Sequence, residues 1–316
     1  MMNRRHFLLG SFACLAACHG NRTSLRHSVT IARAASYSAD LVDLIRRILV
    51  EHRVAVKGQR ILLKPNLVEF SSSAPINTHP VLVASVVEAF ISLGAAQVCI
   101  GEGPGHRRMT LDMAEAAGFF QSIPGFEKRF TDLNIDAVVL TRLPRPFSSL
   151  SGLYLPQTVF DCDLVVSLPK MKTHHWTGAT LSMKNLFGIV PGAVYGWPKN
   201  ILHWAGIDEC IADLHFLFPR QFSIVDGIEG MEGNGPILGT PKWAGVVVAG
   251  SHPPSVDATC CEIMQIDPRK IKYLKLISRR DPAWNIGASR QIGESIESVG
   301  TRFALHPDLE ALRLVV

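Results

Sequence analysis

The sequence has no pair of cysteines at the Cys-x-x-Cys spacing that iron–sulfur clusters commonly use. Its seven cysteines are scattered, apart from the neighbours Cys260 and Cys261. An iron–sulfur cluster is therefore not expected from this chain. A disulfide between distant cysteines remains open, because the sequence cannot choose the partners. Otherwise we expect most of the cysteines to be small buried hydrophobic residues.

The N-terminal apolar run is too short to cross a bilayer, which takes roughly 20 residues. It follows the pair Arg4-Arg5 and ends in "LAAC". Twin arginines in this position resemble the signal for twin-arginine export, and "LAAC" resembles a lipobox in which Cys18 is lipidated. We expect residues 1–18 to be a signal peptide, and the protein to be exported by the twin-arginine machinery and lipid-anchored on the periplasmic side of the cell envelope. The alternative is an uncleaved anchor helix.

Charge is neither abundant nor concentrated: 19% of the residues are charged, and the formal net charge is +5. There is no basic stripe interleaved with aromatic residues, so nucleic-acid binding is not expected. The hydrophobic content of 47% over 316 residues is that of a globular protein that can bury a sizeable core.

Apolar runs alternate with segments of helical periodicity along the first third of the chain. Strands are predicted at 28–34 and within 59–70 and 96–105, and helices at 40–52 and 80–93. This alternation predicts an α/β fold with a mostly parallel sheet flanked by helices. The proline-containing segment around 120–160 is less regular and is predicted to be an insertion or small subdomain. We expect residues 28–280 to form the domain and residues 281–316 to be a C-terminal tail packed on it.

The segment "KMKTHHWTGATLSMKNLFGIV", residues 170–190, contains no Asp or Glu. Other polar loops also follow predicted strands, where ligands of parallel α/β proteins tend to bind. In order, "LLKPNLV", "THP", "GEGPG", "SLPKMKTH", "LSMKNLFG", "VDGIEGMEGNGP" and "VDA" resemble the family called domain of unknown function 362, over about residues 60–265. The resemblance implies no settled reaction. Some members carry a ferredoxin-like segment with cysteine clusters, which this chain lacks.

Lysines in the strand-end loops favour an anionic ligand such as a carboxylate or phosphate. The alternative is that these lysines face solvent. Lys184 lies in an otherwise apolar segment, and a desolvated amine suits a base or a Schiff-base nucleophile. We expect Lys184, His174 and Lys172 to be catalytic. The residues predicted to bind the substrate are Lys64, Asn66, Lys170, Asn185, Gly233, Asn234 and Gly235.

The acids that would balance these lysines occur later in the chain. Asp226, Glu232 and Asp257, together with His174, are predicted to hold a divalent metal. The glycines of the 226–236 loop would expose N–H groups able to cradle an anion. Since adjacent side chains of an extended segment point to opposite sides, only His174 of the His174-His175 pair is expected to enter the site.

Three functions remain open from the sequence. The first is a metal-assisted enzyme acting on a small carboxylate or phosphate. Within it, "GEGPGHRR" and the lysine–histidine composition also resemble nickel-dependent lactate racemases, in which a lysine holds an organic nickel cofactor. The second is a lipid-anchored protein that binds an anion or metal without catalysis. The third is a redox accessory protein that uses Cys260-Cys261 or a bound cofactor.

Overall fold

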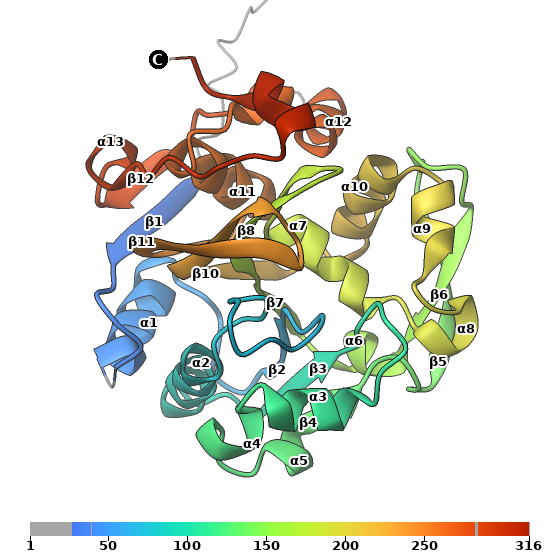
Figure 1. The fold of residues 1–316 in the computed structure, drawn as a ribbon. Helices are drawn as coiled ribbons and strands as arrows, with labels where there is room; N and C mark the ends of the chain where they lie inside the picture. The colour runs from blue at the N-terminus through green and yellow to red at the C-terminus, as the bar shows by residue number, and fades with distance from the viewer. Residues whose placement is uncertain (1–26, 39, 282–283, 316) are drawn as a thin grey trace, which may run out of the picture.

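The computed structural model describes residues 27–38, 40–281 and 284–315. The predicted signal peptide and its lipidation site Cys18 lie outside these residues. Ten strands of the described chain form one mixed sheet in the order β12-β1-β11-β10-β7-β2-β3-β4, with β8 and β9 attached to β10 (Figure 1). Their bounds are β1 (Ser28–Arg33), β2 (Arg60–Pro65), β3 (Gln97–Glu102), β4 (Phe130–Asp132), β7 (Leu164–Leu168), β8 (Lys170–His174), β9 (Gly178–Thr180), β10 (Gln221–Asn234), β11 (Leu238–Gly250) and β12 (Arg290–Gly293).

The half of the sheet that contains β10, β7, β2, β3 and β4 is parallel, which confirms the predicted α/β fold. The other half differs, because β11 runs antiparallel to both β10 and β1. That antiparallel part was not predicted, since periodicity in a sequence identifies strands but not their partners.

Helices cover both faces of the sheet (Figure 1). Successive residues of β2 separate the two cores: Ile61 and Leu63 pack on one side and Leu62 on the other. The first face is covered by α1 (Asp40–Glu51), α2 (Pro80–Ser92), α3 (Thr110–Ala116), α4 (Phe119–Ser122) and α5 (Phe126–Arg129), and the second by α7 (Ser182–Asn185), α10 (Ile207–Leu217), α11 (Pro253–Ile263) and α12 (Lys272–Arg280).

Shorter elements complete the chain. They are α6 (Gln157–Asp161), α8 (Gly192–Tyr195), α9 (Asn200–Trp204), α13 (Ile296–Val299) and the 3-10 helices η1 (Leu186–Ile189), η2 (Pro268–Lys270) and η3 (Pro307–Leu312). No helix of the described residues is both long and apolar enough to cross a membrane.

Two regions of weak sequence patterning have clear places in the fold. Within 120–160, β4 extends the main sheet, while β5 (Val138–Arg142) and β6 (Gly152–Pro156) pair as a separate two-stranded sheet. In the C-terminal segment, β12 pairs with β1, and the side chain of Phe303 is fully buried in the core.

Candidate functional site

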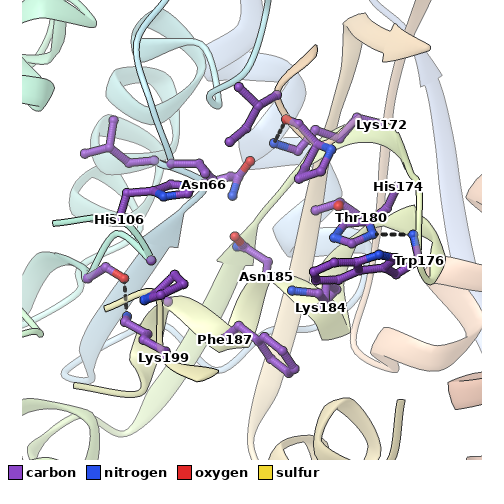
Figure 2. Close-up of a pocket in the computed structure, with 18 of the residues that line it drawn as sticks. Asn66, His106, Lys172, His174, Trp176, Thr180, Lys184, Asn185, Phe187 and Lys199 are labelled. Atoms are coloured by element: carbon purple, nitrogen blue, oxygen red, sulfur yellow. Dashed lines mark hydrogen bonds between the residues drawn. The ribbon is translucent and has the colours of Figure 1, made fainter. Parts of the chain in front are cut away.

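A cavity of about 480 Å³ lies beyond the carboxyl ends of β2 and β3, where loops from several elements meet (Figure 2). Four lysines and four histidines line it, but Glu102 is the only acidic residue in its wall among the described residues. The predicted residues that line it are Lys64, Asn66, Lys172, His174, Lys184, Asn185 and Asn234. Basic and neutral side chains therefore form most of the polar wall of the cavity.

The one acid of the wall is already neutralised. The Nζ of Lys64 lies 2.5 Å from Oε2 of Glu102, and both side chains are fully buried. The other Glu102 oxygen accepts from the backbone N–H of Gly103 at 2.9 Å. Burial lowers the pKa of Lys64, and the Glu102 charge opposes that shift. Glu102 thus cancels one lysine and leaves the others without a counterion from the wall.

Lys172 and Lys184 differ in how their amines are held, although both line the cavity. The Nζ of the fully buried Lys172 donates to the carbonyls of Ile76 at 2.8 Å and Pro236 at 3.2 Å, and burial followed by the charge of Lys170 lowers its pKa well below the usual value. Burial and then the charge of Lys64 lower the pKa of Lys184 to about 7. Both amines therefore lose their protons at a lower pH than the amine of a surface lysine does.

The fourth lysine, Lys199, was missed by sequence reasoning. It is 3% exposed, and its Nζ donates to the carbonyl of Gly103 at 2.5 Å. Burial lowers its pKa to about 7. The signal available in the sequence was a lysine in the "YGWPKN" turn, but nothing in that turn indicates that it folds back over the end of β3.

His174 is held as a neutral hydrogen-bond donor. Its Nδ1 accepts from the backbone N–H groups of Trp176 at 3.1 Å and Thr177 at 3.4 Å, so the ring proton is on Nε2. Burial and then the charge of Lys184 lower the pKa of His174 well below its usual value. In this tautomer Nε2 has no lone pair for a metal, so His174 is suited to donating a hydrogen bond to a ligand oxygen.

Both histidines of the pair line the cavity, contrary to the prediction that only His174 would. The strand β8 ends at His174, and the turn into β9 brings the two rings to a centroid distance of 5.0 Å. His175 has the opposite arrangement: its Nδ1 lies 2.7 Å from the carbonyl of Gly235, which can only accept, so Nε2 keeps a lone pair. The pair thus offers one donor and one acceptor.

Two buried polar oxygens of the wall have no hydrogen-bond partner among the described residues. They are Oδ1 of Asn66 and Oγ1 of Thr180. Asn185, by contrast, is fully used: it donates to the carbonyl of Lys64 at 2.8 Å and to Oγ of Ser167 at 3.0 Å. Asn185 therefore positions the wall, whereas Asn66 and Thr180 are available to a ligand.

Lys170 and Asp226 do not line the cavity, although both were predicted site residues. They form a buried ion pair with 2.6 Å between Nζ and Oδ2. Asp226 also accepts from the hydroxyl of Tyr37 at 2.8 Å and from the backbone N–H of His79 at 2.9 Å. Asp226 therefore neutralises the buried Lys170. Its carboxylate oxygens are occupied by these partners and are not presented to a metal.

The predicted glycine-rich anion cradle is instead part of a strand, because β10 continues through Asn234 and pairs with β11. A Cβ atom on Gly230 would lie 2.5 Å from the carbonyl of Met171, and one on Gly235 would lie 2.1 Å from that of Thr173. These glycines allow β8 to approach closely. Gly233 and Gly235 are not in the cavity wall, and Glu232 binds the N–H of Ala304 and Lys242.

Asp257 holds the segment that carries Lys184. Its carboxyl oxygens accept from the backbone N–H groups of Ser182 at 2.7 Å and Met183 at 3.1 Å, and burial raises its pKa to about 7. Replacing Asp257 with alanine leaves two buried N–H groups unsatisfied, at about 1–3 kcal/mol each. We expect Asp257→Ala to lower the free energy of unfolding by that order, measured by urea denaturation. An unchanged midpoint would show that water replaces the carboxylate.

The cavity does not fit a divalent cation. The four predicted ligands His174, Asp226, Glu232 and Asp257 are not brought together, because each acid has the internal partners described above. The described residues contain one group of three possible ligand atoms within 4.8 Å of one another, from His27, His252 and Asp281, and none of these lines the cavity. The rings of His27 and His252 stack at a centroid distance of 3.7 Å with an interplanar angle of 12°, so this possible metal-ligand group is a separate place in the fold from the cavity.

The fold and the cavity define an α/β protein with a cavity lined by lysines and histidines near the carboxyl ends of its parallel strands. The chain belongs to the family described as domain of unknown function (DUF362), whose family model matches residues 61–262. A relative described as a thylakoid-associated protein of Synechocystis sp. is 30% identical over 258 residues, which cover 77% of this chain and 76% of that protein.

Two solved structures are similar at a TM-score of 0.47. One is a protein from Thermotoga maritima, with 16% identity over 73% of this chain and 60% of that one. The other is the lactate racemase apoprotein from Thermoanaerobacterium thermosaccharolyticum, with 13% identity over 77% of this chain and 58% of that one. The match spans less than two thirds of either solved protein, and at these scores neither bears on the chemistry of this chain.

Proposed function

We propose that the cavity binds a small organic anion, a carboxylate or phosphate, and that the chain is an enzyme that uses a lysine amine as its reacting group. One observation carries the proposal. Lys184 lines the cavity, and among the described residues its amine lies over the ring of Phe187 but has no hydrogen-bond or ion-pair partner. An amine kept in that state is destabilising unless a ligand uses it.

The roles follow from the contacts of each residue. Lys172 and Lys199 supply positive charge or N–H donors to the anion. His174 donates from Nε2, and His175 accepts at Nε2. The exposed ring of Trp176 and the ring of Phe187 give the cavity apolar surface, so a ligand with an apolar part suits it. Because the wall does not suit a divalent cation, this proposal replaces metal assistance with lysine chemistry.

Anion binding is expected to depend on pH through Lys184. Its pKa of about 7 means that the amine is charged below that value and neutral above it. Propionate, which stays ionised throughout, should therefore bind more tightly at about pH 6 than at about pH 8. In Lys184→Arg the charge is permanent, so calorimetric titration should find a smaller difference. An equal pH dependence in both proteins would assign it to another group.

The proposal is tested by turnover as well as by binding. Carboxylates and phosphate esters are first screened for thermal stabilisation, since a ligand at 100 times its Kd stabilises by about 2.7 kcal/mol. Ligands that stabilise the protein are then incubated with it and analysed for product. Stabilisation without any product would favour a binding protein. Neither stabilisation nor product would contradict the anion site itself.

We also propose that the chain is exported and lipid-anchored through Cys18. The Arg4-Arg5 pair and "LAAC" support this, and a relative is described as thylakoid-associated. Replacing Cys18 with serine should abolish incorporation of labelled fatty acid and release the protein from the membrane fraction. Replacing Arg4 and Arg5 with lysines should block export. Fatty-acid labelling that survives Cys18→Ser would contradict the assignment of the lipid to Cys18.

A further inference from the structure

We infer that the substrate is a 2-oxo carboxylate or a closely similar carbonyl compound, and that Lys184 forms a transient imine with it. The inference rests on the proposed function for its anion contacts. It adds a covalent step, which the geometry of the four lysine amines supports.

Three of the four amines are engaged. Lys64 is paired with Glu102, Lys199 donates to Gly103, and Lys172 donates to two carbonyls. Lys184 instead lies with its Nζ 3.7 Å from the centroid of the Phe187 ring, and it remains partly accessible from the cavity. An amine that reacts must present its lone pair to the substrate, and Lys184 is the one whose other contacts are only with a ring face.

The surroundings of Lys184 lower the pKa of its amine and so favour the neutral form, which is the nucleophile. The cavity is lined by three more lysines, and desolvation together with the charge of Lys64 opposes protonation of Lys184. A desolvated lysine beside another cation is an established way to activate an amine. The N–H groups of the neighbouring lysines can donate to the carboxylate of a 2-oxo acid and orient its carbonyl group.

The step balances without an oxidant or a metal. The lone pair of Nζ forms a bond to the carbonyl carbon, and the π electrons of the C=O bond move to oxygen, which a donor such as His174 Nε2–H can stabilise. Proton transfer from nitrogen to oxygen gives a carbinolamine. Loss of water then leaves the imine, so that amine and carbonyl compound give imine and one water. When the imine nitrogen takes up a proton from water, the cationic imine draws electrons from the neighbouring carbon and makes the substituents of that carbon easier to lose.

The size and lining of the cavity agree with this class of substrate. A volume of about 480 Å³ lies in the range of small-molecule sites. Phe187, Ile237 and Leu238 provide apolar contacts, while Asn66 and Thr180 offer unused oxygens. A 2-oxo acid with an apolar side chain can use both kinds of surface.

The test is reductive trapping with cyanoborohydride in the presence of pyruvate or phenylpyruvate. The wild-type protein should gain one carboxyalkyl group, equal in mass to the 2-oxo acid less one oxygen atom. Peptide mapping should place this group on Lys184. Lys184→Arg keeps a positive charge but has no nucleophilic amine of this kind, so it should not be labelled. Lys275→Arg, which changes an exposed lysine outside the cavity, should be labelled like the wild type.

The outcomes separate this inference from the proposed function. Labelling of Lys184 that Lys184→Arg abolishes supports the imine. Absence of labelling with both acids, while propionate still binds, overturns the imine and leaves the anion site standing. Labelling on Lys172 or Lys199 instead overturns the assignment to Lys184. Absence of both labelling and propionate binding overturns the two together.

A separate observation points to a redox-sensitive pair. The Sγ atoms of Cys99, in β3, and Cys162, just after α6, lie 3.4 Å apart. Cys99 is buried, whereas Cys162 is partly exposed. The hydrogen bond between the two thiols lowers the pKa of Cys99 and raises that of Cys162. We propose that this pair forms a disulfide by exchange with a small-molecule disulfide such as oxidised glutathione.

The exchange also balances. The accessible Cys162, after it gives up its proton, attacks the glutathione disulfide, releasing one glutathione and forming a mixed disulfide at Cys162. The sulfur of Cys99 then displaces the second glutathione, and the two protons of the pair end on the released thiols. The other described cysteines, Cys210, Cys260 and Cys261, are all buried, so none of them presents an accessible sulfur. The predicted redox role of Cys260-Cys261 therefore has less support than Cys99-Cys162.

Peptide mapping under non-reducing conditions tests the pair after incubation with oxidised glutathione. A Cys99–Cys162 linked peptide, lacking two hydrogens, is expected, with a Tm about 5–10 °C above that of the reduced protein because the bond closes a long loop. Cys162→Ser should show neither effect, while Cys210→Ser should behave as the wild type. Alkylation of both Cys99 and Cys162 after the incubation would overturn the proposal.

Discussion

Asp226→Asn is expected to lower the free energy of unfolding by about 3–5 kcal/mol, because it removes the charge that neutralises a buried lysine. Lys170 and Asp226 have side-chain exposures of 1% and 0%, with 2.6 Å between their charged atoms. Water cannot replace the lost carboxylate charge at such a site. Asparagine keeps the shape of the side chain, so the effect would report the charge rather than a cavity. Urea denaturation provides the measurement.

Two further variants, one in an exposed ion pair and one that removes both buried charges, serve as controls for Asp226→Asn. Asp43 pairs with Arg46 at 3.1 Å on the exposed face of α1, and Asp43→Asn should change stability by less than about 1 kcal/mol. Combining Lys170→Met with Asp226→Asn removes both charges, so the double variant should be more stable than Asp226→Asn alone. A double variant as unstable as the sum of the two single variants would mean that the pair is not coupled.

Lys184→Met is expected to weaken anion binding while leaving the protein as stable as before or more stable. The loss of a hydrogen bond to a charged ligand amounts to about 1.5–3 kcal/mol, which corresponds to about 10–150-fold in Kd. Stability should not fall, because methionine replaces an amine that lacks a polar partner among the described residues with an apolar group of similar length. Calorimetric titration with propionate and urea denaturation measure the two effects.

A fall in anion affinity together with unchanged or higher stability distinguishes a ligand-binding role of Lys184 from a structural one. Lys64→Met provides the contrast inside the same cavity: it would leave Glu102 buried without its partner, so both binding and stability should fall. Lys275→Met, at an exposed position, should change neither. If Lys184→Met destabilised the protein as strongly as Lys64→Met and left propionate binding intact, Lys184 would be a structural residue.

The elements with strong periodicity could be predicted from the sequence. The helix at 40–52 and the strands before Lys64 and Glu102 occur as expected, because their apolar spacing matches one burial pattern only. Three of the cavity's four lysines, Lys64, Lys172 and Lys184, were identified because polar loops after parallel strands gather at one edge of the sheet.

What failed depended on strand pairing and side-chain contacts, which the sequence pattern does not show. The acids and glycines after Asp226 resemble a loop, yet β11 pairs with that segment and makes it a strand. The sequence also could not show that Lys170 takes Asp226 as its partner, or that Lys199 reaches Gly103. The Lys170–Asp226 and Lys199–Gly103 contacts each join residues more than fifty positions apart in the sequence. The predicted metal ligands did not converge for that reason.

The most direct test of the central claim is anomalous diffraction from crystals soaked separately in tungstate, a tetrahedral oxyanion, and in a manganese(II) salt. A cationic ligand site predicts a tungsten peak in the cavity beside Lys172 and Lys184, and no manganese peak there. A manganese peak between His174 and His175, with no tungsten in the cavity, would contradict the anion site and support a metal site in its place.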